Sequence, residues 1–285
     1  MYTHEITRSN RTAFLIAIDQ SCSMQESVIV RSRRMTKAEA VAVITDRLID
    51  ELIMRARREE GVRNYYDIAV IGYGNDEVRP LLGDTLDFVP VTVLASREVG
   101  KRELQFERLL PSGERSMAHE RVTEWIAPHA AGSTPMYEAL TAAASLVERW
   151  CAEPQNAESF PPIVFNITDG EATDCDERQL REVAARVRAT ATADGNVLLV
   201  NVHISTNTTQ RAIVFPRMDE IGRDNRHARL LAEISSTVPE AMNEAVRRYR
   251  NDFALPPFVA MSYNASITEA VAILDIGSRS ATVLR

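Results

Sequence analysis

The sequence predicts a Rossmann-like α/β fold, with a doubly wound, mostly parallel central sheet and helices on both faces. Three observations lead to this prediction. Apolar runs of strand length alternate with amphipathic helical patterns along almost the whole chain. The run AFLIAI at 13–18 is apolar at every position, which is typical of a strand covered on both faces. Several of these runs end abruptly in polar loops, as strands do at the functional edge of such sheets.

The expected strands are apolar or β-branched runs that stop at polar or glycine-containing turns. They are 13–18, 65–74, 162–168, 196–205 and 257–263. The segment 88–95 has a similar composition but contains Pro90, which cannot donate a hydrogen bond within a sheet. We therefore expect an edge strand or an irregular segment there.

The expected helices show apolar residues at spacings of three and four. They are 37–59, 135–150, 176–193, 226–235, 239–250 and 267–276. The first follows Thr36 and carries Glu39 three residues after it, which predicts a capping box. The charged region 96–130 is expected to hold two short helices, near 103–110 and 117–126.

Length and composition favour one globular unit. The chain has 285 residues, of which 45% are hydrophobic, and it contains no repeat or low-complexity linker. We expect a single domain over 1–285, with a motif-bearing core at 11–205. Residues 206–285 are expected to complete this fold or to form a C-terminal extension.

Charge and cysteine content exclude several classes of protein. The net charge of −7 argues against sequence-independent nucleic-acid binding, so the basic runs RSRR (31–34) and RARR (55–58) are interpreted as a solvated loop and a helix face. No apolar stretch approaches the roughly 20 residues of a membrane span, and the N-terminus lacks the core of a signal peptide. The three cysteines match neither a metal motif nor a disulfide framework. We expect a soluble cytoplasmic protein.

Polar residues stand directly after two of the predicted strands and directly before one predicted helix. Asp19, Ser21 and Ser23 occupy alternate positions directly after the first strand, Thr134 precedes a helix, and Asp169 follows the strand at 162–168. If the first and third strands are neighbours, these residues meet at the carboxyl edge of the sheet. Each residue alone is explained as well by a helix cap or a turn.

The chemistry of this set indicates a hard cation. Carboxylates and hydroxyls are oxygen donors, which favour Mg²⁺, Mn²⁺ or Ca²⁺ over Zn²⁺ or Cu²⁺. If hydroxyls contact the ion and the carboxylates act mostly through water, the ion keeps much of its positive charge. It would then attract a carboxylate from outside the chain.

The three polar segments together resemble the motifs of von Willebrand factor A domains. DQSCS (19–23) resembles the DxSxS motif of that family, GSTPMYEAL (132–140) resembles its threonine loop, and ITDGEATD (167–174) resembles its third loop. The resemblance covers roughly 11–205, and the order of the motifs matches. One departure is Cys22, at a position where glycine is common.

The resemblance implies an intact metal-ion-dependent adhesion site. Ser21 and Ser23 would bind the ion through their hydroxyls, and Thr134 would bind it directly in a ligand-bound state and through water otherwise. Asp19 and Asp169 would lie beside the ion and hold it directly or through water. The expected ion is Mg²⁺, with Mn²⁺ or Ca²⁺ as substitutes.

Size and motif style resemble, more narrowly, the tellurium-resistance-associated A-domain proteins of bacteria. Such proteins tend to be encoded beside kinases and phosphatases in stress or conflict systems. This resemblance implies a bacterial stress-response protein with partners of those kinds.

Three functions are compatible with the sequence. The first is a non-enzymatic module that binds an Asp or Glu of a protein partner through the ion. The second is a Mg²⁺-dependent phosphohydrolase, although Ser21 stands where such enzymes carry a second Asp, and no phosphate loop is present. The third is a scaffold whose metal site is structural or vestigial.

Overall fold

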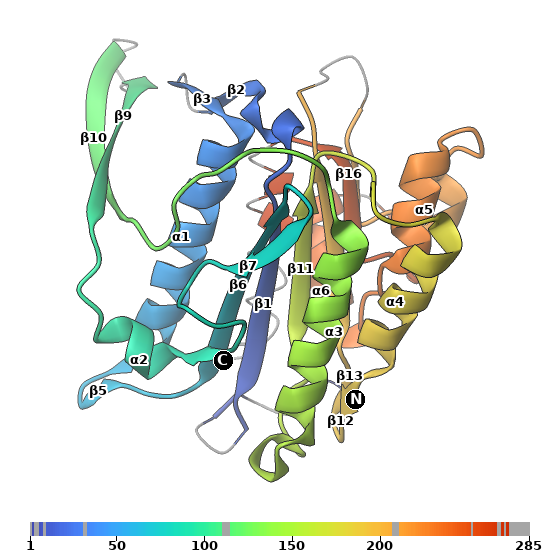
Figure 1. The fold of residues 1–285 in the computed structure, drawn as a ribbon, viewed down its shortest axis with the longest axis horizontal. Coiled ribbons are helices and arrows are strands. Elements are labelled where there is room, and N and C mark those ends of the chain that lie inside the picture. The colour runs from blue at the N-terminus through green and yellow to red at the C-terminus, as the bar shows by residue number, and fades with distance from the viewer. Residues whose placement is uncertain are drawn as a thin grey trace.

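A mixed sheet of eight strands forms the centre of the computed structural model (Figure 1). The structure describes residues 2, 6–7, 10–30, 33–109, 115–206, 211–251, 253–266, 269–270 and 272–273. The parallel strands are β1 (Thr12–Asp19), β6 (Tyr66–Gly74), β11 (Ile163–Thr168), β14 (Leu198–Ile204) and β16 (Met261–Ala265). The antiparallel strands are β7 (Glu77–Pro80), β8 (Val89–Pro90) and β15 (Ile213–Val214). The predicted class, a doubly wound and mostly parallel α/β sheet, is confirmed.

Helices cover both faces of the sheet. One face is packed by α1 (Lys37–Ala56), α2 (Val91–Ala95) and α6 (Asn243–Arg250). The other is packed by α3 (Met136–Ala152), α4 (Glu177–Ala189) and α5 (Arg226–Ile234). The 3-10 helices are η1 (Cys22–Gln25), η2 (Pro154–Asn156), η3 (Met218–Glu220) and η4 (Glu240–Met242). In the part of the chain that is described, none of the helices is long and apolar enough to cross a membrane.

The sequence explains why these elements form where they do. Every residue of β1 is buried, and Ile16 lies between Phe165 of β11 and Val70 of β6. The capping box at the start of α1 is confirmed, since Thr36 accepts from the backbone of Glu39 and the Glu39 side chain accepts from the backbone of Thr36. The last expected strand begins later than predicted, at Met261. Of the helix expected at 267–276, residues 269–270 and 272–273 are helical, and the rest lie outside the described residues.

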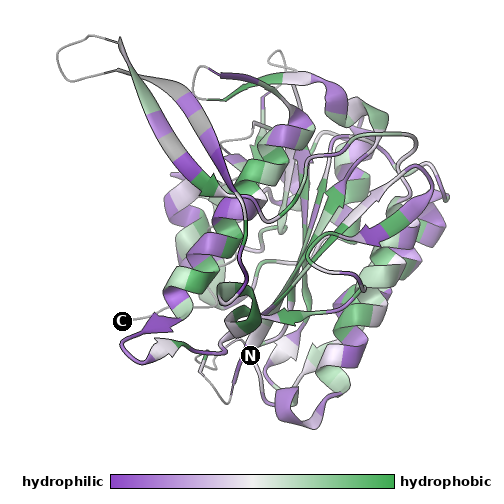
Figure 2. Ribbon diagram, turned by 60° about the vertical axis from the view of Figure 1, so that its left-hand side comes forward, coloured by the Kyte–Doolittle hydropathy of each residue, from purple (hydrophilic) through white to green (hydrophobic). Residues whose placement is uncertain are grey.

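The two short helices expected within 96–130 are wrong. This region forms a hairpin of β9 (Lys101–Leu109) and β10 (Arg115–Thr123), which projects from the body of the molecule in Figure 2. In ELQFE (103–107) polar and apolar residues alternate, which is the period of a strand. Glu103 also lies opposite Arg121, so opposite charges face each other across the pair.

The expectations for the basic runs also need correction, and the edge strand expected at Pro90 is confirmed only for Val89–Pro90. Arg33 and Arg34 belong to a hairpin of β2 (Ser27–Val30) and β3 (Arg33–Thr36), so they do not lie in a loop; residues 31–32 lie outside the described part. α1 ends before Arg57, and the pair Arg57–Arg58 forms β4, which pairs with β5 (Gly61–Val62). The segment 88–95 is a two-residue strand that stops at Pro90 and continues as α2, because proline cannot donate to a sheet but suits a helix start. A further small hairpin joins β12 (Ala191–Thr192) to β13 (Gly195–Asn196).

The strand order reverses its direction at one point of the carboxyl edge. The order is β15-β16-β14-β11-β1-β6-β7, so β1 and β11 are neighbours. The chain moves from β1 toward β6 on one side and from β11 toward β14 on the other. In doubly wound sheets this reversal of direction creates the place where ligands bind.

Candidate metal centre

Asp19 is the last residue of β1 and is fully buried. Its Oδ1 accepts a hydrogen bond from the backbone nitrogen of Ser21 at 2.9 Å. Its Oδ2 accepts one from the hydroxyl of Thr168, the last residue of β11, at 2.7 Å. The carboxylate therefore joins the ends of the two strands at the point where the strand order reverses. Thr168 was not among the predicted site residues, although its place directly before Asp169 in the motif was a usable signal.

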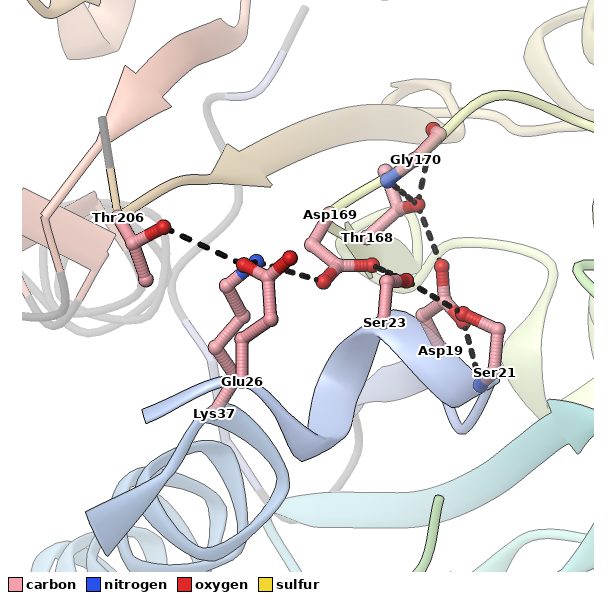
Figure 3. A network of polar contacts seen from close by, with 9 residues as sticks. All are labelled: Asp19, Ser21, Ser23, Glu26, Lys37, Thr168, Asp169, Gly170 and Thr206. Atoms are coloured by element: carbon pink, nitrogen blue, oxygen red, sulfur yellow. Dashed lines mark hydrogen bonds and ion pairs between the residues drawn. The ribbon is translucent and has the colours of Figure 1, made fainter. Parts of the chain in front are cut away.

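Two serines continue this network toward Asp169 (Figure 3). The hydroxyl oxygens of Ser21 and Ser23 lie 3.1 Å apart, and the Ser23 hydroxyl donates to Asp169 Oδ1 at 2.6 Å. The helix η1 holds the serines, because the backbone nitrogens of Met24 and Glu26 donate to the carbonyls of Ser21 and Ser23. Four of the five predicted site residues thus form one continuous set of contacts.

Thr134, the fifth, lies beside this network without joining it. Its backbone nitrogen donates to the Thr173 hydroxyl at 2.9 Å, and its carbonyl accepts from the Thr173 nitrogen at 3.0 Å, which fixes the threonine loop against the third loop. The Thr134 hydroxyl oxygen is 3.9 Å from the position that a Cβ would take on Gly170, next to Asp169. Among the described residues, this hydroxyl makes no hydrogen bond to the other four.

Cys22 ties the first loop to the threonine loop. Its backbone nitrogen donates to the carbonyl of Gly132 at 3.0 Å, and its Sγ accepts from the Gly132 nitrogen at 3.0 Å. Gly132 has φ +69, and a Cβ there would come within 2.5 Å of Asn75 Cα, so glycine is needed at this position. The departure from glycine at Cys22 therefore does not separate the loops.

Asp174 and Asp176 contact the starts of two different helices. Asp176 is the N-cap of α4. Asp174 instead accepts from the backbone nitrogens of Tyr137 and Glu138, at 3.1 and 3.0 Å, in the first turn of α3. Carboxylates satisfy free backbone donors at a helix start, and the third loop brings Asp174 closer to α3 than to the helix that follows it.

Lys37 and Glu26 belong to the network but were missed from the sequence. Lys37 is the first residue of α1 and only 4% exposed. Its Nζ donates to Asp169 Oδ2 at 2.8 Å and to Glu26 Oε2 at 2.7 Å, and the Thr206 hydroxyl donates to the same Glu26 oxygen at 3.2 Å (Figure 3). No local signal predicted this contact, because 132 positions separate Lys37 from Asp169 in the chain.

The charges in the network are not balanced. Burial raises the pKa of Asp19; hydrogen bonds from Ser21 and Thr168 oppose this, and the nearby charge of Asp169 adds to it. Burial also opposes the charge on Lys37, but its hydrogen bonds and ion pairs with Asp169 and Glu26 outweigh it and raise the pKa of the lysine. When ionised, the two buried aspartates therefore face a single buried ammonium.

The donors fit a small divalent ion. Octahedral Mg²⁺ at about 2.1 Å from each ligand places adjacent oxygens about 3 Å apart, and the Ser21–Ser23 separation of 3.1 Å matches this spacing. Ser23 uses its one proton on Asp169, which leaves Ser21 as the donor in the contact between the serines. Both hydroxyl oxygens then keep lone pairs for an ion. In the described part of the chain, no three His, Cys, Asp or Glu side chains form a metal cluster, so hydroxyls and water would have to supply the other ligands.

Comparisons with known proteins give only remote similarities. No family model and no curated protein matches the chain. The chain is similar to a solved von Willebrand factor type A structure from Catenulispora acidiphila, at 16% identity and TM-score 0.43, over 69% of this chain and 34% of that one. It thus spans about a third of that protein's length.

Two further solved structures are similar over more of their own length. One is the SpRpn10 VWA domain, at 11% identity and TM-score 0.44, over 79% of this chain and 83% of that one. The other is the vWF domain of the type V pili tip protein Mfa5 from Porphyromonas gingivalis, at 11% identity and TM-score 0.43, over 97% of both chains. Matches this remote add nothing to what the strand order already shows about the fold.

Proposed function

We propose that this chain is a von Willebrand factor A-like, non-enzymatic binding module that uses Mg²⁺ to capture an Asp or Glu of a protein partner. Asp19, Ser21, Ser23, Thr134 and Asp169 would hold the ion, and Mn²⁺ or Ca²⁺ could replace Mg²⁺. The observation that carries this proposal is the continuous contact from Asp19 through both serines to Asp169, at the strand-order reversal. A bacterial stress-response role with kinase or phosphatase partners is part of the proposal on sequence resemblance alone.

The donor set explains why an outside carboxylate would bind. Hydroxyl ligands are neutral, so they leave the charge of a bound ion largely uncompensated. Asp19 already accepts from Ser21 and Thr168, and both oxygens of Asp169 are hydrogen-bonded, so neither carboxylate is free to surround the ion fully. A carboxylate from a partner would complete the ion's ligands and neutralise its charge.

The scaffold alternative has one observation in its favour. Lys37 already places a positive charge on Asp169, so the network has an internal source of charge compensation. A structural or vestigial site would let the metal change stability but not partner binding. The phosphohydrolase alternative has no such support, because the hydroxyl of Ser21, two residues after Asp19, contacts Ser23 and offers no carboxyl as a general acid.

Selection of displayed random peptides in Mg²⁺ tests the capture of a carboxylate. We expect enriched peptides that share an Asp or Glu, lose binding when that residue becomes Ala, and dissociate on chelation. The double variant Ser21→Ala/Ser23→Ala should lose these peptides, whereas Ser27→Ala, in the exposed start of β2, should keep them. Peptides that bind equally with chelator, or without any acidic residue, would refute the proposal.

A further inference from the structure

Lys37 stands out in both sequence and structure. The chain contains 33 basic residues, but only Lys37 and Lys101 are lysines. Lys101 is exposed at the start of β9, whereas Lys37 is buried with an ammonium between two carboxylates. Almost every other basic position of the chain is an arginine, whereas the position beside the candidate metal centre is a lysine, whose ammonium is compact and flexible.

The Lys37 ammonium donates a hydrogen bond to the Asp169 oxygen that receives none from a serine. Ser23 donates to Oδ1 and Lys37 to Oδ2, so the carboxylate has a partner on each side. A divalent ion drawn to Asp169 therefore meets a positive charge already in contact with that carboxylate. Two cations that share one carboxylate repel each other, and binding of one weakens binding of the other.

Glu26 gives the ammonium a second partner. It is about half exposed, with 55% of its side chain accessible, and the Thr206 hydroxyl donates to the oxygen that binds Lys37. The lysine stem has four rotatable carbons, so Nζ can leave Asp169 and keep its contact with Glu26. Displacement would then not leave a buried charge without a partner, which would otherwise be costly.

We propose that Lys37 is a built-in competing cation, which holds Asp169 in the absence of a divalent ion and retreats to Glu26 when the ion binds. It thereby lowers and sets the affinity of the centre for metal, and through the metal its affinity for a partner's carboxylate. This inference rests on the proposed metal site.

The first test compares metal affinity in matched variants. Binding of Mn²⁺ is measured by electron paramagnetic resonance at fixed ionic strength in the native chain, Lys37→Met and Lys101→Met. We expect Lys37→Met to bind Mn²⁺ about tenfold more tightly, the usual effect of removing one close like charge, and Lys101→Met to match the native chain. Equal or weaker binding in a Lys37→Met protein with a native far-ultraviolet dichroism spectrum would overturn the inference.

The variant Glu26→Gln should change the metal affinity in the opposite direction to Lys37→Met. Without Glu26, the ammonium has only Asp169, so metal binding should weaken. The loss should be smaller when Glu26→Gln is made in the Lys37→Met background, because the competitor is then absent. An equal loss in both backgrounds would show that Glu26 acts on the ion independently of Lys37, and would also overturn the inference.

The reactivity of Lys37 can be compared with that of Lys101 in the same molecule, because these are the two lysines of the chain. Limited acylation of amines, followed by peptide mass spectrometry, compares Lys37 with Lys101 in chelator and in excess Mg²⁺. We expect acylation of Lys37 relative to Lys101 to rise with Mg²⁺, and this rise to be absent in Asp19→Ala. Unchanged labelling with tight metal binding would contradict displacement.

These outcomes separate the inference from the proposed function. Metal binding by the native chain, without tighter binding in Lys37→Met, contradicts the inference and leaves the metal site in place. Absence of binding in both proteins contradicts the metal site itself. Binding only in Lys37→Met supports the inference and shows that Lys37 blocks the centre in the native chain.

Discussion

Buried aspartates lie at both ends of the central sheet, and their partners differ. At the amino end of β6, Asp67 Oδ2 pairs with Arg11 Nε at 3.2 Å and accepts from Trp150 Nε1 at 2.8 Å. At the carboxyl end, Asp19 and Asp169 share hydroxyl donors and one ammonium. At the first end one buried carboxylate meets the Arg11 guanidinium, which also contacts the half-exposed Glu153. At the second end two buried carboxylates meet one ammonium, which also contacts the half-exposed Glu26.

The comparison shows that burial of a carboxylate does not by itself distinguish the two ends, whereas the ratio of buried carboxylates to the cations that contact them does. A third buried aspartate supports this reading. Asp46 of α1 accepts from the backbone nitrogens of Trp125 and Ile126, and burial raises its pKa to about 7 despite those hydrogen bonds. The raised pKa of Asp46 favours its neutral form below about pH 7, Arg11 pairs with Asp67, and the carboxyl-end pair has one buried ammonium for two buried carboxylates.

The largest expected effect is at the balanced amino end. Arg11→Ala leaves Asp67 buried without its counter-ion, so the free energy of unfolding should fall by about 3 kcal/mol. Urea unfolding measures the change, with Arg178→Ala in an exposed ion pair as the control, where less than about 0.5 kcal/mol is expected. The loss should be the same with and without Mg²⁺. If Mg²⁺ restored the lost unfolding free energy, the amino and carboxyl ends of the sheet would no longer be distinguished.

A smaller, pH-dependent effect is expected at Asp46. Its folded pKa of about 7 lies above the usual value of 3.8, so the fold binds a proton that the unfolded chain releases, and stability falls as pH rises from about 4 to about 7. Asp46→Asn keeps an oxygen for both backbone donors and removes this loss. We expect it to exceed the native chain in unfolding free energy by about 2 kcal/mol at about pH 8 and to match it near pH 4.

Urea unfolding across this pH range checks the prediction for Asp46. The matched control is Asp84→Asn, in an exposed bend, which should follow the native chain at every pH. If Asp46→Asn tracks the native chain as well, Asp46 is ionised in the fold, and the contrast drawn with the carboxyl end loses its third example.

The smallest expected effect is a change in unfolding free energy on substitution of Asp19, and its sign should reverse when Mg²⁺ is added. Asp19 is buried beside Asp169 with a raised pKa, so without metal its charge is unfavourable in the fold. Asp19→Asn in chelator should therefore have a slightly higher free energy of unfolding than the native chain. In excess Mg²⁺ the order should reverse, because only the native chain gains stability from the ion. A variant less stable than the native chain in chelator would show that Asp19 is balanced without an ion.

The sequence predicted most of the fold because buried parallel strands and amphipathic helices leave strong local patterns. β1 and α1 are examples, with an unbroken apolar run and a capping box. The hairpin of β9 and β10 was missed because its strands pair with each other outside the main sheet. Without burial on a sheet face, charged residues dominate its composition, and the alternation of ELQFE is short.

The sequence motifs predicted several of the polar residues that meet at the candidate site, but they did not include Lys37. The contacts among Asp19, Ser21, Ser23 and Asp169 were anticipated, because their loops follow predicted strands. Lys37 was not anticipated there, since its position after Thr36 has a sufficient local explanation in the start of α1. The contact between Lys37 and Asp169 joins residues 132 positions apart, and no motif in the sequence links the start of α1 to the third loop.

The most direct test of the central claim is thermal unfolding during a Mg²⁺ titration of the chelator-stripped protein, beside Asp19→Ala and Asp169→Ala. An ion that binds only the folded chain raises its melting temperature, by about 5 °C when Mg²⁺ reaches about a hundred times its dissociation constant. We predict this rise in the native chain and its loss in both variants. A native chain whose melting temperature does not respond to Mg²⁺ or Mn²⁺, or variants that respond equally, would contradict a metal centre between β1 and β11.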